Sequence, residues 1–402
     1  MGLKEVHVRT KFLEKFPGPL DKGDWIPYNV SAYIAIRIRL FFLHSNVNVY
    51  IGPIFSNKIK ESIVVSTTIK DVAKRAGVSI ATVSRVLNDV GPVDTQTRHR
   101  VRNAAKDLRY VPNALGRSLS IKRTDAIGLL LPDLFGEFFS EVLRGSDQTA
   151  QRSHYHLVVS SSHNNKDEIR AALAMMRGRV DGIVIMSPHI DAETLDENLP
   201  HSLPVVLLNC YVDSNGFDSL NIDNYGGAFA MTTHLLSHGY DPIAIIKGVE
   251  KNFEAAERLR GFRTAIEQGG VQPDPQLEFA GLFTEASGYE AARKILAASR
   301  RPRAIFACND SMAIGALSAL RDSGIRVPED IALAGFDDVP IASYLTPTLT
   351  SVQVNIQNLG VQAIETVTHA VKHKNTHSKK QVLLNTTLTL RESCGCPNQS
   401  NS

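Results

Sequence analysis

The sequence contains few cysteines, and their number and positions restrict the kind of protein it encodes. Only four occur in 402 residues, at Cys210, Cys308, Cys394 and Cys396. Four scattered cysteines do not form a disulfide framework, so we expect reduced thiols in a cytoplasmic protein. Cys394 and Cys396 make a short pair, but we identify no second Cys/His pair at ligand spacing. We therefore predict no metal site.

Long apolar runs are also absent. Charged side chains persist through position 15, and this excludes an ordinary secretory signal peptide. The apolar patches between residues 33 and 55 are interrupted by Arg37, Arg39 and His44, so they are too short to span a membrane. We predict no membrane partner.

Motifs of common enzymes are missing as well. The chain has no GxxxxGK[ST], no HExxH, no GxSxG and no GxGxxG after a strand. Its thirteen histidines are dispersed, and none accompanies an obvious Ser/Asp constellation. We predict a protein that is not an enzyme, with no catalytic residues and no cofactor. Turnover of a small molecule would contradict this prediction.

What the sequence does contain is a helix-turn-helix pattern at residues 68–88, TIKDVAKRAGVSIATVSRVLN. The first helix carries apolar residues at helical spacing, namely Ile69, Val72, Ala73 and Ala76. Gly77 permits a tight turn, and Ser79 is a good N-cap for the second helix. Two such helices are typical of a DNA-binding module whose second helix enters the major groove. A helical hairpin inside a core is the alternative.

A third helix and a concentration of positive charge follow. Asp94 can cap a helix that continues to about residue 108. Residues 68–124 contain twelve Lys/Arg and four Asp. Their net charge is about +8, whereas the residues after 124 carry about −9. A basic head on an acidic body is expected of a domain that neutralises DNA phosphates.

From about residue 68 to residue 394 the chain resembles the lactose-repressor/galactose-repressor (LacI/GalR) family of bacterial transcription regulators. The resemblance rests on the run IKDVAKRAGVSIATVSRVLN, on YVPN at residues 110–113 and on RSL at residues 117–119. It implies a helix-turn-helix domain at 67–112, a hinge helix at 113–124 and a two-lobed domain at 125–402 that binds an effector and dimerises. We expect the N-lobe at 125–222 and 354–378, and the C-lobe at 223–353 and 379–396.

Residues 1–66 depart from the family pattern, because the family's helix-turn-helix lies almost at the N-terminus. No methionine occurs between Met1 and Met175, so an internal start would need another codon, for example at Val64 or Val65. We expect this leader to be an upstream region joined by start-site assignment, or a poorly ordered extension. A partner-binding or membrane-anchoring segment is the alternative. Mass spectrometry of the native N-terminus distinguishes these cases.

Candidate DNA contacts fall into three groups. Ser79, Thr82 and Thr97 should hold phosphates. Ile80, Ala81 and Arg85 should face base edges, and Arg85 can pair bidentately with a guanine. The remaining candidates on this module and on the hinge are Thr68, Ser84, Asn88, Asn113, Arg117 and Leu119. The resemblance implies that Leu119 wedges into the central base step of the operator. An unstructured linker is the alternative to a hinge helix.

After residue 125, short apolar runs alternate with amphipathic stretches, and this predicts doubly wound parallel α/β sheets. We expect strands at 127–131, 157–160, 182–186, 205–209, 243–247, 304–307 and 331–335. We expect helices at 139–152, 166–177, 225–237, 255–268, 286–298 and 311–323. Ligands bind such sheets at the carboxyl ends of the strands, where polar residues gather in this sequence.

The resemblance also implies which residues form the effector pocket: Phe138, Phe139, Asn209, Arg258, Phe283, Asn309 and Asp337. An Arg/Asn/Asp cluster gives directed hydrogen bonds to hydroxyl groups, and an aromatic ring can stack on the apolar face of a sugar. Helix capping, lobe packing or a surface ion pair is the alternative role for each of these side chains.

We therefore predict a cytoplasmic, nucleoid-associated transcriptional regulator, a repressor that binds a pseudo-palindromic operator in double-stranded DNA as a homodimer. A small-molecule effector should control it, with a sugar as first choice and a nucleoside or purine as second. An exported or cytosolic sugar-binding protein of the same two-lobed fold without a regulatory role is the alternative. The tail CGCPNQSNS has no leucine heptads, so we expect no coiled-coil tetramerisation segment.

Overall fold

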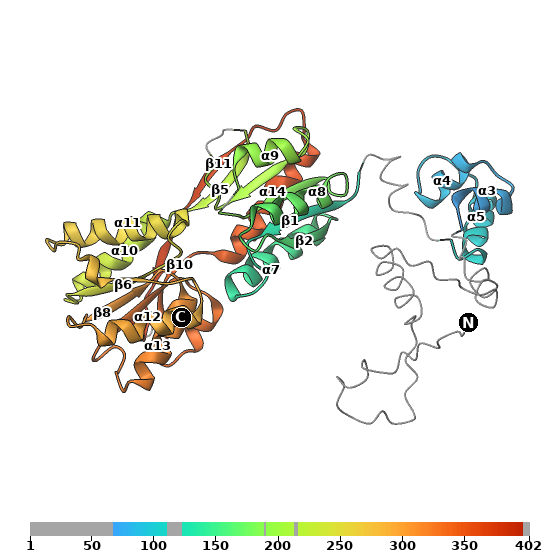
Figure 1. Cartoon of the computed structure of the whole chain (residues 1–402). Helices are drawn as coiled ribbons and strands as arrows, with labels where there is room; N and C mark the ends of the chain where they lie inside the picture. Colours follow the sequence, from blue (N-terminus) through green and yellow to red (C-terminus); the bar gives the residue numbers. More distant parts are fainter. Residues whose placement is uncertain (1–66, 111–122, 189, 213–215, 397–402) are drawn as a thin grey trace, which may run out of the picture. The chain divides into compact units, whose positions relative to one another are not determined.

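The computed structural model describes residues 67–110, 123–188, 190–212 and 216–396 (Figure 1). The chain divides into two compact units, residues 1–111 and 112–402, and we describe each by itself. The leader and most of the predicted hinge lie outside the described residues. Within the described ranges, no helix is both long enough and apolar enough to cross a membrane.

The described residues of the first unit, 67–110, form three helices, α3 (Ile69–Ala76), α4 (Ile80–Leu87) and α5 (Thr95–Asp107). Ser79 accepts a hydrogen bond from the amide of Thr82, and Asp94 accepts one from the amide of Thr97, so both predicted N-caps are present. Gly77 has a φ of 65°, a left-handed conformation that glycine adopts without a Cβ penalty. The helix-turn-helix and the third helix are therefore confirmed.

Small side chains form the core of this unit. The buried residues are Val72, Ala73, Ala76, Val83, Val86, Val101, Ala104 and Ala105. They alternate with exposed polar residues at the spacing of one helix face, so each helix buries a narrow stripe against the other two. The apolar pattern of the local sequence accounts for the packing of the whole unit.

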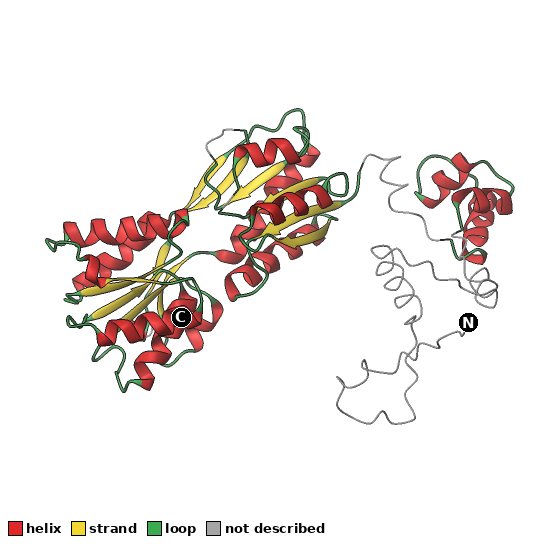
Figure 2. Cartoon of the chain, in the orientation of Figure 1, coloured by secondary structure: helices red, strands yellow, loops and turns green. Residues whose placement is uncertain are grey.

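The second unit has two lobes, each built on one six-stranded sheet with helices on both faces (Figure 2). The first sheet has the order β11-β5-β4-β3-β1-β2, and all its neighbouring strands are parallel. Its strands are β1 (Ala126–Leu131), β2 (His156–Ser161), β3 (Gly182–Ile185), β4 (Val205–Leu208), β5 (Asp218–Ile222) and β11 (Gln381–Leu384). The helices of this lobe are α7 (Glu137–Arg152), α8 (Lys166–Met176), α9 (Ala192–Asn198) and α14 (Ile356–Lys372).

The central strand β1 contains no polar side chain because helices cover both of its faces. Ile127 and Leu129 pack in a core shared with α7 and α14, whereas Leu130 packs in a second core with α8 and α9. Successive side chains of a strand point to opposite faces, so a strand covered on both faces must be apolar at every position.

The second sheet has the order β12-β10-β9-β8-β6-β7. Its strands are β6 (Ile243–Lys247), β7 (Glu278–Ala280), β8 (Ala304–Ala307), β9 (Ala332–Asp337), β10 (Thr350–Gln353) and β12 (Thr387–Thr389). They are parallel except for the edge strand β12, which pairs antiparallel with β10. Its helices are α10 (Asn224–Ser237), α11 (Phe253–Gln268), α12 (Glu285–Ala297) and α13 (Asp310–Asp322). Three short 3-10 helices, Pro275–Leu277, Pro340–Tyr344 and Glu392–Cys394, complete the described elements.

The chain crosses between the lobes three times, after β5, after β10 and after β11. The return of the chain to the second lobe, expected at residue 379, comes later in the structure. Gln381–Leu384 pairs with β5 in the first sheet, so the return comes after residue 384. The pairing partner decides to which lobe this four-residue strand belongs, and the sequence of the strand does not reveal that partner.

Helix α14 belongs to the first lobe because it packs closely on α7. A Cβ on Gly145 would lie 2.0 Å from the carbonyl oxygen of Gln357, and one on Gly360 would lie 2.3 Å from that of Val142. Only glycine permits this approach of the two backbones. Helix α14, although it comes late in the sequence, thereby covers part of one face of the first sheet.

Candidate functional site

The exposed face of α4 carries the side chains expected to contact bases. Val83 and Val86 are buried, whereas Ile80, Ala81 and Arg85 are exposed on the other side. Ile80 is 45% exposed, so its apolar side chain can contact a ligand. Among the described residues, Arg85 has no hydrogen-bond or ion-pair partner, so its guanidinium is available to a ligand.

The predicted phosphate contacts already have partners within the domain. The hydroxyls of Ser79 and Thr82 lie 2.9 Å apart, and the amide of Thr82 donates to Ser79. Thr97 accepts a hydrogen bond from Arg100. These hydroxyls therefore hold the start of each helix, and each keeps part of its hydrogen-bonding capacity for a phosphate oxygen.

The other predicted contacts on this unit are also engaged locally. The carboxylate of Asp71 accepts from the backbone amide and the hydroxyl of Thr68, at 2.8 and 2.7 Å. The side-chain amide of Asn88 donates to the hydroxyl of Ser84 at 3.3 Å. Asn113, Arg117 and Leu119 lie outside the described residues.

Part of the positive charge of the head is neutralised within the unit. Asp89 forms ion pairs with both Arg98 and Arg102. Arg75 lies 3.7 Å from Asp107. The charge count of the sequence therefore overstates the charge that is free to neutralise phosphates.

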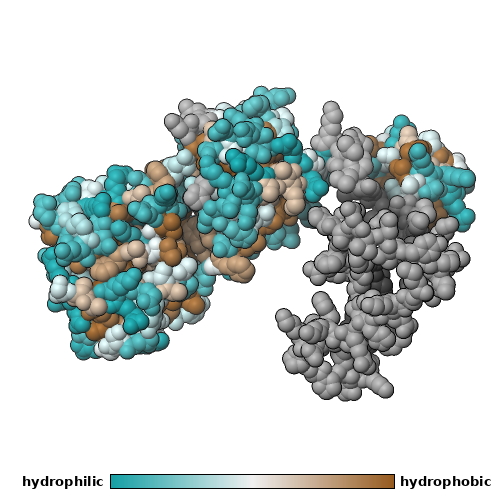
Figure 3. Space-filling model, in the orientation of Figure 1, coloured by the Kyte–Doolittle hydropathy of each residue, from teal (hydrophilic) through white to brown (hydrophobic). Residues whose placement is uncertain are grey.

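A cavity of about 380 Å³ lies between the two lobes of the second unit. Its volume is within the range of small-molecule sites. Segments that follow β1, β2 and β3 line it from one lobe, and segments that follow β6, β7, β8 and β9 line it from the other. The carboxyl ends of both sheets thus face one space, as expected for doubly wound sheets. In Figure 3 apolar atoms appear where the lobes meet on a largely hydrophilic surface.

Arg258 on α11 lies at the base of the cavity with its side chain almost completely buried. Its Nε donates to Asn224 at 2.8 Å, and Nη1 donates to the carbonyl oxygen of Cys308. Its Cζ lies 3.7 Å from the centre of the Phe336 ring, a cation–π contact. This set of contacts fixes the orientation of the guanidinium in the cavity.

Two carboxylates share the remaining edge of that guanidinium. Arg258 Nη2 lies 3.4 Å from Asp337 and 3.9 Å from Glu254. Burial raises the pKa of Asp337 to about 7, with Arg258 opposing the shift and Glu254 adding to it. Burial also raises the pKa of Glu254, again against Arg258. Asp337 Oδ1 is buried and has no hydrogen-bond partner among the described residues, so it can accept one from a ligand.

All three predicted aromatic residues line the cavity. Phe138 and Phe139 pack edge to face with ring centroids 5.5 Å apart. Phe283 adopts a φ of 61° and packs against Gly248, where an added Cβ would lie 2.1 Å from the ring. The rings provide apolar walls from both lobes.

Asn309 lines the cavity, but both of its amide atoms are engaged. Its oxygen caps α13 by accepting from the amide of Met312, and its nitrogen donates to the carbonyl oxygen of Phe283 at 3.1 Å. Asn309 therefore holds the Phe283 loop in position, and only part of its hydrogen-bonding capacity is left for a ligand.

Asn209 is the one predicted pocket residue that is absent from the wall of the cavity. Its oxygen accepts from the amide of Ile222 and from Asn224, at 3.2 and 3.5 Å. Asn224 in turn accepts a hydrogen bond from Arg258. Asn209 therefore positions Arg258 indirectly, through Asn224. The sequence analysis missed Asn224 and Glu254. Glu254 precedes Arg258 by four residues on the same helix, a spacing that could have revealed it.

Comparisons with known proteins cover both units. Residues 68–113 match the family described as bacterial regulatory proteins, lacI family, and residues 232–394 match a periplasmic binding protein-like domain. The HTH-type transcriptional repressor PurR of Pasteurella multocida (strain Pm70) is 35% identical over 311 residues, which are 77% of this chain and 93% of that protein.

Two solved structures are similar over most of the chain. A transcriptional regulator CelR–cellobiose complex is 32% identical with a TM-score of 0.61, covering 81% of this chain and 99% of the other. The lac repressor dimer bound to operator and the anti-inducer ONPF is 27% identical with a TM-score of 0.70, covering 82% of this chain and 99% of the other. These similarities include the helix-turn-helix and both lobes. The chain belongs to the lacI family of bacterial regulatory proteins, and it is a DNA-binding transcriptional regulator with a small-molecule effector.

Proposed function

We propose that the effector is a small neutral molecule rich in hydroxyl groups, with a sugar as the first candidate. The observation that carries this proposal is the charge of the cavity wall. Among the described residues that line it, the acidic side chains are Asp133, Glu137, Glu254, Glu285 and Asp337, and the basic side chain is Arg258. Since Arg258 already faces two carboxylates, a phosphorylated or carboxylated effector would meet net repulsion.

The polar groups that remain available suit hydroxyl donors. Asp337 Oδ1 faces Arg258 Nη2 at 3.4 Å and has no hydrogen-bond partner among the described residues, so this buried oxygen can still accept a hydrogen bond from a ligand. A sugar hydroxyl can donate to it while a ring face packs on Phe283 or Phe138. A purine or nucleoside can also donate a ring N–H and stack on phenyl rings, so it is the second candidate. The solved CelR relative is a complex with cellobiose.

On the DNA side, we propose that Arg85 recognises a guanine and that Ile80 and Ala81 make apolar contacts with base edges. The exposure of all three side chains and the free guanidinium of Arg85 support this assignment. Ser79, Thr82 and Thr97 would contact phosphates, and the hinge residues Asn113, Arg117 and Leu119 would contact the operator centre. The chain would act as a homodimeric repressor on a pseudo-palindromic operator.

We infer that the protein acts by binding and not by turnover, since the relatives named above are transcriptional regulators. Its proposed location is the cytoplasm, on the nucleoid, because its ligand is chromosomal DNA. No cofactor and no membrane partner are part of this proposal.

Calorimetry on the full chain tests the effector class directly. The panel contains neutral mono- and disaccharides, nucleosides and purine bases, and the phosphate ester of each sugar. We expect saturable binding of a neutral sugar and at least tenfold weaker binding of its phosphate. Tighter binding of the phosphate, or of a purine over every sugar, would overturn the sugar assignment.

Selection from a random pool of duplex DNA tests the regulatory side. The enriched duplex should contain two half-sites related by a two-fold axis, and the effector should change its affinity for the protein. Enrichment of a single, non-repeated site would contradict the proposed homodimer.

A further inference from the structure

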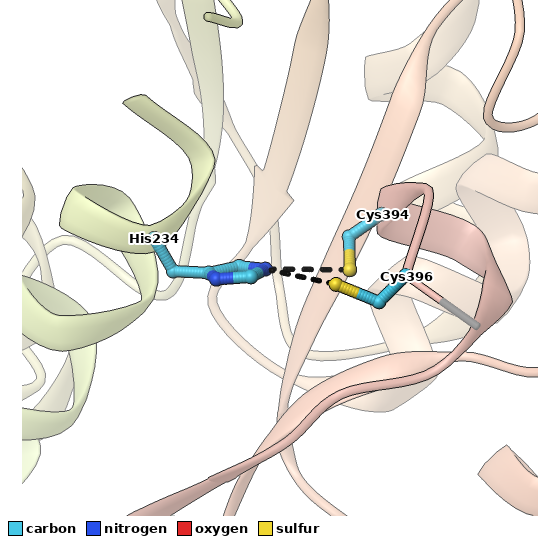
Figure 4. Close-up of side chains that lie close together, drawn as sticks. All are labelled: His234, Cys394 and Cys396. Atoms are coloured by element: carbon cyan, nitrogen blue, oxygen red, sulfur yellow. Dashed lines mark hydrogen bonds between the residues drawn. The ribbon is translucent and has the colours of Figure 1, made fainter. Parts of the chain in front are cut away.

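A cluster of sulfur and imidazole groups lies in the second lobe, away from the residues that line the effector cavity (Figure 4). His234 is in the last turn of α10, and Cys394 and Cys396 are in and after the last 3-10 helix. The ligand atoms of these three residues all lie within 4.8 Å of one another. Figure 4 shows the imidazole of His234 pointing at both sulfur atoms. Chain segments about 160 residues apart in sequence therefore converge on one point.

The two distances from His234 to the sulfur atoms are close to those between neighbouring ligands of one tetrahedral zinc ion. Zn–S bonds of about 2.3 Å and Zn–N bonds of about 2.0–2.1 Å put neighbouring ligand atoms roughly 3.5–3.8 Å apart. His234 Nε2 lies 3.4 Å from Cys394 Sγ and 3.9 Å from Cys396 Sγ. A hydrogen bond between one thiol and one imidazole would explain a single contact, but not two sulfurs at this distance from the same nitrogen.

His238 lies next to this group, outside the set of three residues whose ligand atoms are all within 4.8 Å of one another. Its Nε2 lies 3.5 Å from Cys396 Sγ, and its ring centroid is 4.6 Å from that of His234. Residues four apart in a helix lie on the same face, which is how paired histidines bind zinc from one helix. Two thiolates and two neutral imidazoles are a common tetrahedral ligand set, and soft thiolates favour zinc over magnesium or calcium.

The backbone holds the two cysteines on the same side of the tail. Gly395 has a φ of 86°, and an added Cβ would lie 2.9 Å from the hydroxyl of Tyr240. That hydroxyl donates to the carbonyl oxygen of Cys394 at 3.1 Å. The left-handed glycine reverses the chain, and Tyr240, which follows α10, anchors the reversal. The cluster is thus pre-organised by contacts that are independent of its ligand atoms.

Groups around Cys394 supply an outer shell. Cys394 is completely buried, and its Sγ lies 3.0 Å from the hydroxyl of Thr350. Ser393 donates to the carbonyl oxygen of Leu333 at 2.6 Å and so fixes the preceding residue on β9. Outer hydrogen bonds of this kind orient the ligands of a metal and raise its affinity.

We propose that His234, Cys394 and Cys396 bind one zinc ion, which fastens the C-terminal tail to the end of α10, and that the neighbouring His238 turns toward the ion to complete its coordination. This proposal departs from the prediction of no metal site, which rested on the lack of a second Cys/His pair at ligand spacing from Cys394 and Cys396. The second pair is His234 and His238, too far away in sequence to be matched to the cysteines by spacing. The proposal is independent of the effector and of DNA binding.

The test uses the tag-free full chain, reduced and stripped of metal, and titrates it with zinc and separately with cobalt(II). We expect one equivalent of either metal per chain. Cobalt should give the visible bands of tetrahedral coordination and a thiolate-to-cobalt charge-transfer band. Zinc should raise the melting temperature of the protein, because it binds the folded state. Absence of saturable binding at micromolar metal under reducing conditions would overturn the proposal.

Variants distinguish this site from adventitious binding. Cys396→Ser and His234→Ala should each weaken zinc binding at least a hundredfold and abolish the charge-transfer band or shift it. Cys210→Ala, which removes a buried thiol of the other lobe, should bind zinc like the wild type. Unchanged binding in Cys396→Ser, or a Cys394–Cys396 disulfide in a protein whose reduced form binds no metal, would refute the site. Circular dichroism of the metal-free variants verifies that they fold.

Discussion

Arg85 in the DNA-binding head and Arg258 in the effector domain show two ways in which a protein uses the same side chain. Arg85 is exposed and has no partner among the described residues. Arg258 is buried, with an amide, a carbonyl, two carboxylates and a phenyl ring around it. Arg85 depends only on helix α4 for its position and is exposed to a ligand. Arg258 is positioned by the tertiary structure, so its loss should affect stability as well as binding.

Arg258→Ala should have the largest effect. It leaves Asp337 and Glu254 without their cation, and removing one partner of a buried ion pair costs about 3–5 kcal/mol. We expect lower stability of the second unit in denaturant and loss of effector binding. Arg260→Ala is the matched control, because Arg260 is exposed and its ion pair with Glu257 is worth about 0–1 kcal/mol. Wild-type effector affinity in Arg258→Ala would refute its role.

Arg85→Ala should change sequence preference and leave stability almost unaffected. Losing a bidentate contact with guanine should relax discrimination at one base pair of each half-site by about 1–3 kcal/mol. Binding to a set of single-substitution operators measures this effect. Arg100→Ala, which removes an exposed cation from α5, should weaken all operators equally. A uniform loss in Arg85→Ala would show that Arg85 contacts phosphate instead.

The affinity for effector should depend on pH through Asp337. Its pKa of about 7 means that the carboxylate, which accepts hydrogen bonds from a hydroxylated effector, becomes about tenfold more populated from pH 6 to pH 8. Affinity should therefore rise about tenfold over this range in calorimetric titrations.

The same group acts on stability in the opposite direction. Because the pKa of folded Asp337 exceeds its usual value of 3.8, its contribution to the free energy of unfolding is complete below about pH 4. That contribution is lost as the pH rises through 7. Asp337→Asn should flatten both profiles, and an unchanged pH dependence of effector affinity in that variant would assign the effect to another group.

Asp94→Ala should give the smallest effect, confined to the head. It removes the N-cap of α5, and the expected cost is about 1 kcal/mol in the stability of this unit. Asp94→Asn is the control, since its amide oxygen can accept the same hydrogen bond from Thr97. Equal destabilisation by both substitutions would indicate that the charge matters, not the cap.

The sequence by itself determined the head and the alternation of strands and helices in the body. Ser79 and Asp94 cap the helices as expected, and buried residues such as Val83 follow the predicted spacing. The predicted strands with continuous apolar sequence, such as 243–247 and 304–307, are β6 and β8. These features follow from hydrogen bonds and apolar patterns within a few residues, so a local window of sequence contains their cause.

Only the tertiary structure decided which distant residues share a site. It assigned β11 to the first lobe through pairing with β5, and it moved Asn209 out of the cavity wall. It also surrounded Arg258 with Asn224 and Asp337, and it brought His234 to Cys394. Such contacts depend on how sheets pair and helices pack across long stretches of chain. No spacing in the sequence encodes them, because the sequence gives the order of residues along the chain and not their distance in the folded protein.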